Sequence, residues 1–144
     1  MQGKVIELFI TQADEQKTRL NVSSIKVDEL GIKNDKFYAK DSMRAILITS
    51  TTSYELTKEN NIDIQTGSLG ENILIDLSPY HLLHGDRLTI GKTTLEITQN
   101  CTLCKGLSTV DSKLPKLLKN DRGIFAKVIS GNSEIHLGDK VEII

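Results

Sequence analysis

Hydrophobic residues recur along the chain in short runs that are separated by turn-forming residues. Runs of four to ten residues, alternating or continuously apolar, are typical of strands, and those bounded by Gly, Asn and Asp are too short for most helices. The segments that this pattern predicts as strands are 4–10, 21–30, 44–49, 72–77, 87–90, 93–98, 124–129 and 140–143. Residues 45–48 are apolar without interruption, which predicts a strand buried on both faces.

Two segments carry helical signals instead. Thr52 and Glu55 match a capping box, which predicts a short helix over 53–60. Pro115 stands near the start of the apolar segment 112–118, where proline is favoured in the first helical turn. We therefore expect two or three short helices among many strands.

The turns suggest how the strands connect. Gly91-Lys92 separates two alternating segments, which predicts a hairpin. The residues expected to point inward from it are Leu88, Ile90, Leu95 and Ile97. Gly85-Asp86 and Gly138-Asp139 precede similar apolar segments, so similar corners are expected at both places. About eight short strands with such corners predict a mostly β fold, a closed or partly closed β-barrel.

Length and composition agree with this fold class. The chain has 144 residues, which indicates a single domain over 1–144 with a sizeable core. Ile, Val and Thr together make up a quarter of the chain. Branched side chains suit a half-buried pleated surface, so this bias favours strands.

The charges exclude several partners. Lys and Arg number 18 against 19 Asp and Glu, and no block of like charge occurs, so we expect no nucleic-acid binding. No apolar run approaches the roughly 18 residues of a membrane span, and Lys4 and Glu7 interrupt the start of the chain. We expect no membrane segment and a cytoplasmic location.

Cys101 and Cys104 are three residues apart and directly follow a predicted strand. Loops at strand ends often carry function, and a thiolate there is a nucleophile whose pKa a cation such as Lys105 lowers. The alternative is that one or both cysteines are small buried hydrophobic residues. A second alternative is a zinc site, because His81 and His84 add a second pair of suitable ligands.

Arginine is scarce, with four residues against 14 lysines, so each one is a candidate for bidentate anion binding. Arg44 opens the most apolar strand and Arg122 precedes the strand at 124–129, and either suits a phosphate or a carboxylate. A partly buried ion pair is the alternative for both. Glu71-Asn72 follows Gly70, where these side chains suit either recognition of a planar ring or turn capping.

Taken in order, these motifs resemble a known family. The motifs are Gly67-x-x-Gly70-Glu71-Asn72, Gly85-Asp86-Arg87-Leu88, Leu95-Glu96-Ile97-Thr98-Gln99 leading to Cys104, Asp121-Arg122-Gly123 and Gly138-Asp139. Their order and spacing resemble the MOSC domain, named for the C-terminus of molybdenum cofactor sulfurase. The resemblance covers nearly the whole chain and is that of a standalone bacterial type, without the family's pyridoxal-phosphate sulfurase domain.

The resemblance implies a barrel of the pyruvate-kinase type and a role with molybdenum cofactor (molybdopterin). Family members are thought to carry sulfur on a cysteine, or to bind the cofactor in reductase systems for N-hydroxylated compounds. Cys104 takes the position of the family cysteine, as sulfur acceptor or molybdenum ligand. A sulfurase of the cysteine desulfurase kind, or a reductase, is the partner that the resemblance implies.

Three positions depart from the family pattern. Phe37 stands where many members have His, Cys101 where Arg is usual, and Leu103 where Pro is usual. The residues expected to hold the pterin phosphate or a substrate anion are Arg44, Lys105 and Arg122, with Glu71 and Asn72 orienting or bracing the loop. Cys101 is then expected to release sulfur by thiol–disulfide exchange. The alternatives are a non-catalytic module that binds a pterin or another anion, and a Cys/His zinc-stabilised domain.

Overall fold

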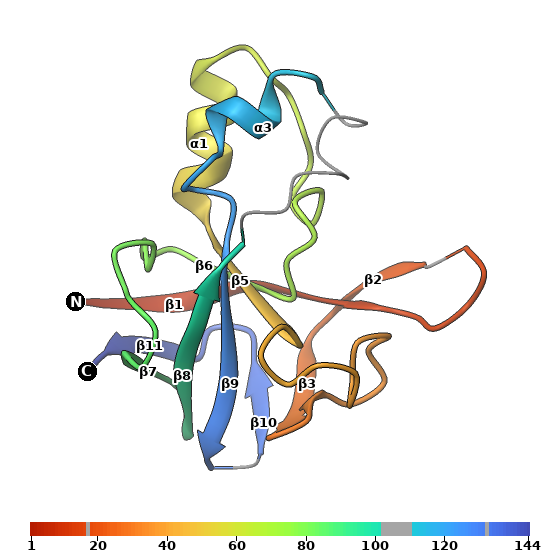
Figure 1. Ribbon diagram of the computed structural model, residues 1–144, viewed down its shortest axis with the longest axis vertical. Helices are drawn as coiled ribbons and strands as arrows, with labels where there is room; N and C mark the ends of the chain where they lie inside the picture. The colour runs from red at the N-terminus through yellow and green to blue at the C-terminus, as the bar shows by residue number, and fades with distance from the viewer. Residues whose placement is uncertain (17, 102–110, 132) are drawn as a thin grey trace.

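The largest sheet of the protein closes into a β-barrel, which occupies the lower part of the view in Figure 1. This computed structural model describes residues 1–16, 18–101, 111–131 and 133–144. The ring is formed in order by β1 (Gln2–Thr11), β11 (Lys140–Ile143), β7 (Arg87–Ile90), β8 (Thr93–Asn100), β9 (Ile124–Ser130), β5 (Ile46–Ser50) and β6 (Ile73–Ile75). Pairing of β6 and β11 with β1 closes it, which confirms the predicted barrel.

A small second sheet lies beside the barrel. It contains β10 (Glu134–His136), β3 (Ser24–Asp28) and β4 (Gly31–Ile32), while β2 (Arg19–Val22) pairs with β1 as a hairpin. The prediction of one strand over 21–30 was wrong. Pairing with β1 ends before Ser23, and the residues after Ser23 pair with β10 instead. β10 was missed because Ile135 is its one apolar residue.

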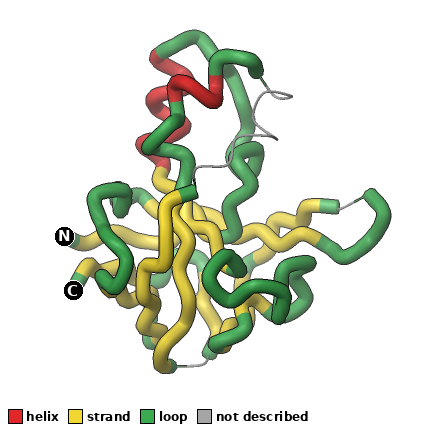
Figure 2. Tube along the Cα trace, in the orientation of Figure 1, coloured by secondary structure: helices red, strands yellow, loops and turns green. Residues whose placement is uncertain are grey.

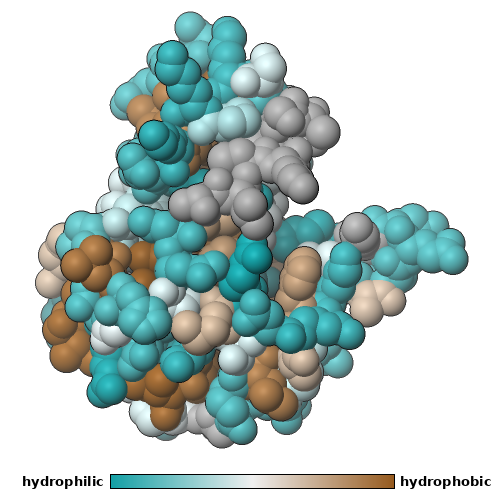
Figure 3. All heavy atoms as spheres, viewed as in Figure 1, coloured by the Kyte–Doolittle hydropathy of each residue, from teal (hydrophilic) through white to brown (hydrophobic). Residues whose placement is uncertain are grey.

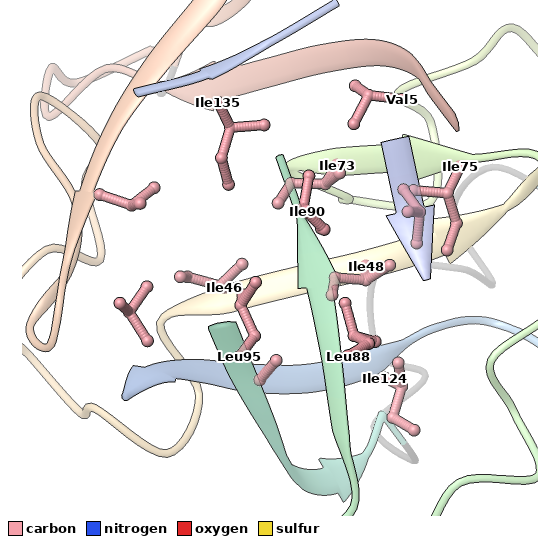
Figure 4. Packing of buried hydrophobic residues seen from close by; sticks show 14 of the residues in the cluster. Val5, Ile46, Ile48, Ile73, Ile75, Leu88, Ile90, Leu95, Ile124 and Ile135 are labelled. Atoms are coloured by element: carbon pink, nitrogen blue, oxygen red, sulfur yellow. The ribbon is translucent and has the colours of Figure 1, made fainter. Parts of the chain in front are cut away.

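The barrel is filled by branched aliphatic side chains, chiefly Ile, Leu and Val, that come from every strand of the ring (Figure 4). Every residue of β5 is buried, as the uninterrupted apolar run predicted. The four hairpin residues expected to point inward, Leu88, Ile90, Leu95 and Ile97, are all buried. At the hairpin turn Gly91 has a φ of 59°, a left-handed conformation that glycine adopts at little cost.

The described residues hold two helices, α1 (Thr51–Glu59) and α3 (Leu114–Leu117), which lie together beyond one end of the barrel (Figures 1 and 2). They share a second apolar cluster that includes Ile62, Leu69, Leu114 and Leu118. On the face drawn in Figure 3, hydrophilic side chains cover most of this helical part. No helix within the described ranges is long and apolar enough to cross a membrane.

The start of α1 differs from the predicted capping box. Ser50 is the N-cap: its backbone is extended, and its Oγ accepts a hydrogen bond from the Thr52 N–H at 3.2 Å. Thr52 lies inside the helix and donates its own hydroxyl to Ser50 Oγ. The helix therefore begins directly from the last residue of β5, with no intervening loop.

The chain returns from α1 through residues 60–72 and enters β6, which pairs in parallel with β5. A parallel pair needs such a crossover, because its two strands enter from the same end. The crossover places segment 67–72 across the barrel end next to β1 and β5, and the candidate site lies there.

The two Gly-Asp corners have the same geometry, as the sequence predicted. Gly85 and Gly138 have φ values of 93° and 82°. Asp86 Oδ2 accepts from the N–H three residues earlier at 2.8 Å, and Asp139 Oδ2 does the same at 2.8 Å. Both corners lead directly into neighbouring strands of the barrel, β7 and β11.

Candidate functional site

A cavity of about 490 Å³ opens at this end of the barrel, and cationic side chains dominate its polar wall. The cations are Arg19, Lys40, Arg44 and Arg122. Its remaining lining residues are Thr11, Phe37, Asp41, Ala45, Leu47, Gly70, Asn72, Cys101 and Phe125. One carboxylate against four cations leaves the wall with an excess of positive charge, so the cavity favours an anion.

Two aromatic rings border the cavity, and each lies under a cation. The guanidinium of Arg44 lies over the Phe125 ring, with 5.5 Å from Cζ to the ring centroid. Lys36 Nζ lies 5.4 Å from the centroid of Phe37, a half-exposed ring on the loop before β5. The ring quadrupole attracts a cation over its face. This attraction holds the flexible side chains of Arg44 and Lys36 beside the two rings.

Arg122 reaches the cavity because the residue after it has no side chain. A Cβ on Gly123 would lie 2.8 Å from Leu47 Cδ1, so only glycine lets β9 begin this close to β5. The Arg122 carbonyl accepts a hydrogen bond from Thr49 Oγ1 at 2.8 Å, and Nε donates to the Leu69 carbonyl at 3.2 Å. Both ends of the residue are thereby fixed against the barrel and the crossover segment.

Arg19 was not among the predicted site residues, although the scarcity of arginine was a signal that applied to it equally. It enters the cavity from β2 and donates hydrogen bonds to Thr11 Oγ1 at 3.0 Å, to the Gly67 carbonyl at 3.2 Å and to the Glu71 carbonyl. Burial lowers the pKa of its guanidinium, and the carboxylates of Glu71 and Asp35 oppose that effect. Arginine remains charged even so.

Asn72 lies on the cavity wall, but its side chain is bonded to the protein. Its Oδ1 accepts from the Leu47 N–H at 3.0 Å, and its Nδ2 donates to the Phe9 carbonyl at 3.2 Å and to Asp35 Oδ1 at 3.3 Å. Three segments of the chain meet at this amide. Of the two predicted roles, orienting a ligand or bracing the loop, these bonds favour bracing.

Asp35 is a second brace of the cavity. It is buried, and its carboxylate accepts from the Thr11 N–H at 2.8 Å and from the Phe37 N–H at 3.0 Å. The loop that carries Phe37, Lys40 and Arg44 is therefore anchored at its first turn to β1. Together with Asn72, Asp35 forms a polar layer between the cavity and the aliphatic core.

Glu71 lies behind the wall rather than on it, because its side chain is fully buried. Its Oε2 accepts from the Tyr54 hydroxyl at 2.5 Å and from the Gly67 N–H at 3.2 Å. Among the described residues no hydrogen-bond partner meets its Oε1. Burial raises the pKa of this carboxyl, and burial and the nearby Glu71 raise the pKa of Tyr54.

Cys101 lies on the cavity wall, buried at the end of β8, with its N–H donating to the Gly123 carbonyl at 3.0 Å. Cys104, Lys105 and Leu103 fall outside the described residues. Of the predicted anion-binding residues, the structure thus brings Arg44 and Arg122 together at one cavity with Cys101, and adds Arg19 and Lys40.

The histidines of the alternative zinc site lie in an exposed loop. His84 Nδ1 is 2.7 Å from the Thr98 carbonyl, and His81 lies three residues earlier. Within the ranges that the structure describes, no group of three or more His, Cys, Asp or Glu side chains is placed to hold a metal ion. The fourth ligand of that alternative, Cys104, lies outside those ranges.

Comparison with solved structures finds the same fold at low sequence identity. The YuaD protein from Bacillus subtilis superposes with a TM-score of 0.81 at 19% identity, covering 99% of this chain and 95% of that one. YiiM from Geobacillus stearothermophilus gives 0.73 at 15%, with 99% and 75% covered. YiiM from Escherichia coli gives 0.71 at 18%, with 100% and 70% covered. Comparison with curated protein sequences gives no match.

The family comparison matches one continuous part of the chain. The MOSC domain model matches residues 35–142, which includes β5 to β10, most of β11 and both described helices. The matched region begins at Asp35, the buried brace of the cavity. The chain therefore belongs to the MOSC domain family.

Proposed function

We propose that the cation-lined cavity binds molybdenum cofactor through its phosphate, and that Cys104 carries sulfur or binds molybdenum beside it. The observation that carries this proposal is the convergence of Arg19, Lys40, Arg44 and Arg122 on one cavity of a MOSC barrel. Guanidinium groups match phosphate oxygens in a bidentate fork, and several of them together favour a doubly charged anion.

The residues present fit the cofactor in size and character. About 490 Å³ lies within the range of small-molecule sites. Phe37 and Phe125 offer apolar ring faces of the kind on which a planar pterin stacks, while the cations suit its phosphate. When bound, the cofactor supplies a molybdenum centre that accepts a thiolate ligand. Arg44 and Arg122 would hold the phosphate, as the family resemblance also implies.

The sulfur-carrying role rests on the thiol pair. The Cys104 thiolate attacks the outer sulfur of a persulfide on a donor sulfurase; a new S–S bond forms at Cys104, and the donor leaves as a thiolate. Cys101 then attacks Cys104 Sγ, hydrosulfide leaves, and a disulfide joins the two cysteines. A cellular dithiol restores both thiols. The positive wall beside Cys101 supports this chemistry, because nearby cations favour the thiolate.

The cofactor arm is tested by the molybdenum and pterin content of the purified native protein. We expect both in the wild-type protein and at least tenfold less of both in Arg44→Ala, since a charged hydrogen bond contributes roughly 1.5–3 kcal/mol. Arg87→Ala is the matched control, because Arg87 is exposed on β7 and does not line the cavity. Equal content in all three proteins would contradict the assignment.

The sulfur arm is tested by treatment with glutathione persulfide, followed by mass spectrometry of the peptide that contains both cysteines. We expect one added sulfur atom in Cys101→Ser, in which the persulfide cannot be resolved, a disulfide between the two cysteines in the wild-type protein, and neither product in Cys104→Ser. Full sulfur uptake by Cys104→Ser would show that this role is wrong. Cofactor content that survives Cys104→Ser without sulfur uptake in any variant would instead support a binding module with no turnover.

A further inference from the structure

A second cavity, of about 610 Å³, adjoins the first one at Arg19. One of its walls is the β1–β2 hairpin, which contributes Phe9, Arg19 and Asn21. The other wall is the crossover segment 65–68. Arg19 lines both cavities, so the two meet at this side chain.

The hydrogen bonds of Arg19 connect its guanidinium to lining residues of both cavities. Its Nη1 donates to Thr11 Oγ1, which belongs to the first cavity, at 3.0 Å. Its Nη2 donates to the carbonyl of Gly67, which belongs to the second cavity, at 3.2 Å. Within the described residues these bonds and that to the Glu71 carbonyl engage three of its five N–H donors.

The second cavity differs from the first in its chemistry. Apart from Arg19, the polar side chains that line it are neutral amides and hydroxyls, namely Asn21, Gln65, Thr66 and Ser68. The first cavity holds three cations besides Arg19, namely Lys40, Arg44 and Arg122, so the positive charge is concentrated on that side. Neutral donors and acceptors of this kind bind hydroxylated groups rather than a second phosphate.

The loop that forms the second cavity is held in place. Gly67 has a φ of +90°, and a Cβ there would lie 2.9 Å from Phe9 Cε1, so its backbone is packed directly against that ring. Its N–H donates to the Tyr54 hydroxyl at 2.9 Å, and its carbonyl accepts from Arg19. The buried Glu71 carboxyl bonds the same N–H and the same hydroxyl from behind.

The hairpin wall also lies outside the region that defines the family. The family match begins at residue 35, whereas Phe9, Arg19 and Asn21 all precede it. This part of the site is therefore contributed by the segment in which the chain is not matched to its family.

We infer that the two cavities form one site for a bipartite ligand, with a phosphate ester in the first cavity and a neutral, polyhydroxylated group in the second. Arg19 contacts the ester where the two parts join. The inference rests on the anion-binding part of the proposed function and adds the class of group that the anion carries.

The test compares methyl phosphate, which fills only the first cavity, with ribose 5-phosphate, which carries a hydroxylated tail. Binding is followed by ¹H–¹⁵N spectra of the full chain. We expect ribose 5-phosphate to bind the wild-type protein at least about fivefold more tightly, as two additional neutral hydrogen bonds provide. It should also shift the amide signals of Thr66 and Ser68, which methyl phosphate leaves in place.

The variant is the double substitution Thr66→Val and Ser68→Ala, which removes two exposed hydroxyls and leaves the first cavity untouched. We expect the preference for ribose 5-phosphate to fall below about twofold, with methyl phosphate binding unchanged. Ser112→Ala, an exposed serine outside both cavities, should retain the full preference.

The two probes separate the possible failures. Equal affinity of both phosphates for the wild-type protein, or a preference that survives the double substitution, would overturn the bipartite site while leaving anion binding in the first cavity standing. Absence of binding by either phosphate would overturn the proposed anion site itself, and the bipartite ligand with it.

Discussion

The guanidinium of Arg44 lies over the ring of Phe125, 5.5 Å from its centroid, at the edge of the cation-lined cavity. Arg44 is exposed, so burial does not restrict its side chain. The ring comes from β9, whose Phe125 pairs with Leu47 in β5, and it is therefore fixed by the barrel. An aromatic residue of the scaffold thus holds a flexible cation at the cavity.

Replacing Phe125 should therefore weaken anion binding without removing a charge. Phe125→Leu keeps an apolar side chain on β9 but removes the ring face, a contact that contributes about 0.5–1 kcal/mol at exposed sites. We expect phosphate to bind about two- to fivefold more weakly, as measured by isothermal titration calorimetry. Arg87→Ala serves as the unchanged reference, and wild-type affinity in Phe125→Leu would show that the ring does not position Arg44.

Asn72 should matter more for stability than its place on the cavity wall suggests. Asn72→Ala leaves the buried Leu47 N–H and the Phe9 carbonyl without their side-chain partners. We expect a loss of about 2–4 kcal/mol in the free energy of unfolding, measured by urea denaturation. Asn21→Ala removes one exposed hydrogen bond, to Glu7, and should cost less than about 1 kcal/mol. Similar losses in the two variants would contradict the bracing role.

The raised pKa of Glu71 makes stability depend on pH in a defined direction. Above its ordinary value near 4.5, the unfolded chain releases this proton while the folded chain retains it until its higher pKa is reached. The folded state then binds more protons, so the free energy of unfolding falls as pH rises through that window. Glu71→Gln has no proton to lose, and its stability relative to the wild-type protein should increase from pH 4 to pH 8.

The measurement is urea unfolding of both proteins across that pH range. Glu59→Gln is the matched control, because Glu59 is exposed at the end of α1. Its difference from the wild-type protein should stay within about 0.5 kcal/mol at every pH. A difference between Glu71→Gln and the wild-type protein that does not change with pH would show that burial does not perturb this carboxyl.

Gly123 should tolerate no side chain. A Cβ there would lie 2.8 Å from Leu47 Cδ1, 3.0 Å from Thr49 Oγ1 and 3.2 Å from the Ile48 carbonyl. Gly123→Ala is expected to destabilise the fold by about 1–3 kcal/mol, the usual cost of overpacking a core. Because Arg122 is the preceding residue, phosphate affinity should fall in the same variant. Unchanged unfolding and affinity would show that β9 and β5 separate easily.

Much of the barrel could be predicted because its strands carry their signal locally. The alternation of Leu88, Ile90, Leu95 and Ile97 around Gly91 is sufficient for a hairpin, and the apolar run at 45–48 for a buried strand. The bend at Ser23 carries no such signal, since the hydrophobic alternation continues through it. β2 and β3 are separate strands because they pair with different partners. β2 pairs with β1, whereas β3 pairs with β10, which lies far away in the sequence.

Among the cations of the site, those predicted from the sequence stood out because arginine is rare. Arg44 and Arg122 stood out among many lysines, and the structure finds both at the cavity. Arg19 has the same scarcity, but β2 reaches the cavity only by pairing with β1, and nothing near it in the sequence marks that contact. The roles of Glu71 and Asn72 as braces likewise depend on Tyr54, Phe9 and Leu47, which only the closed barrel brings to them.

The polar layer of Asp35 and Asn72 separates the loop that lines the cavity from the aliphatic core of the barrel. Phe37, Lys40, Asp41 and Arg44 belong to a loop tethered at its base, and none of these four side chains packs in the aliphatic core. Substitutions at these four positions should therefore change the charge and shape of the cavity wall while leaving the free energy of unfolding of the barrel nearly unchanged.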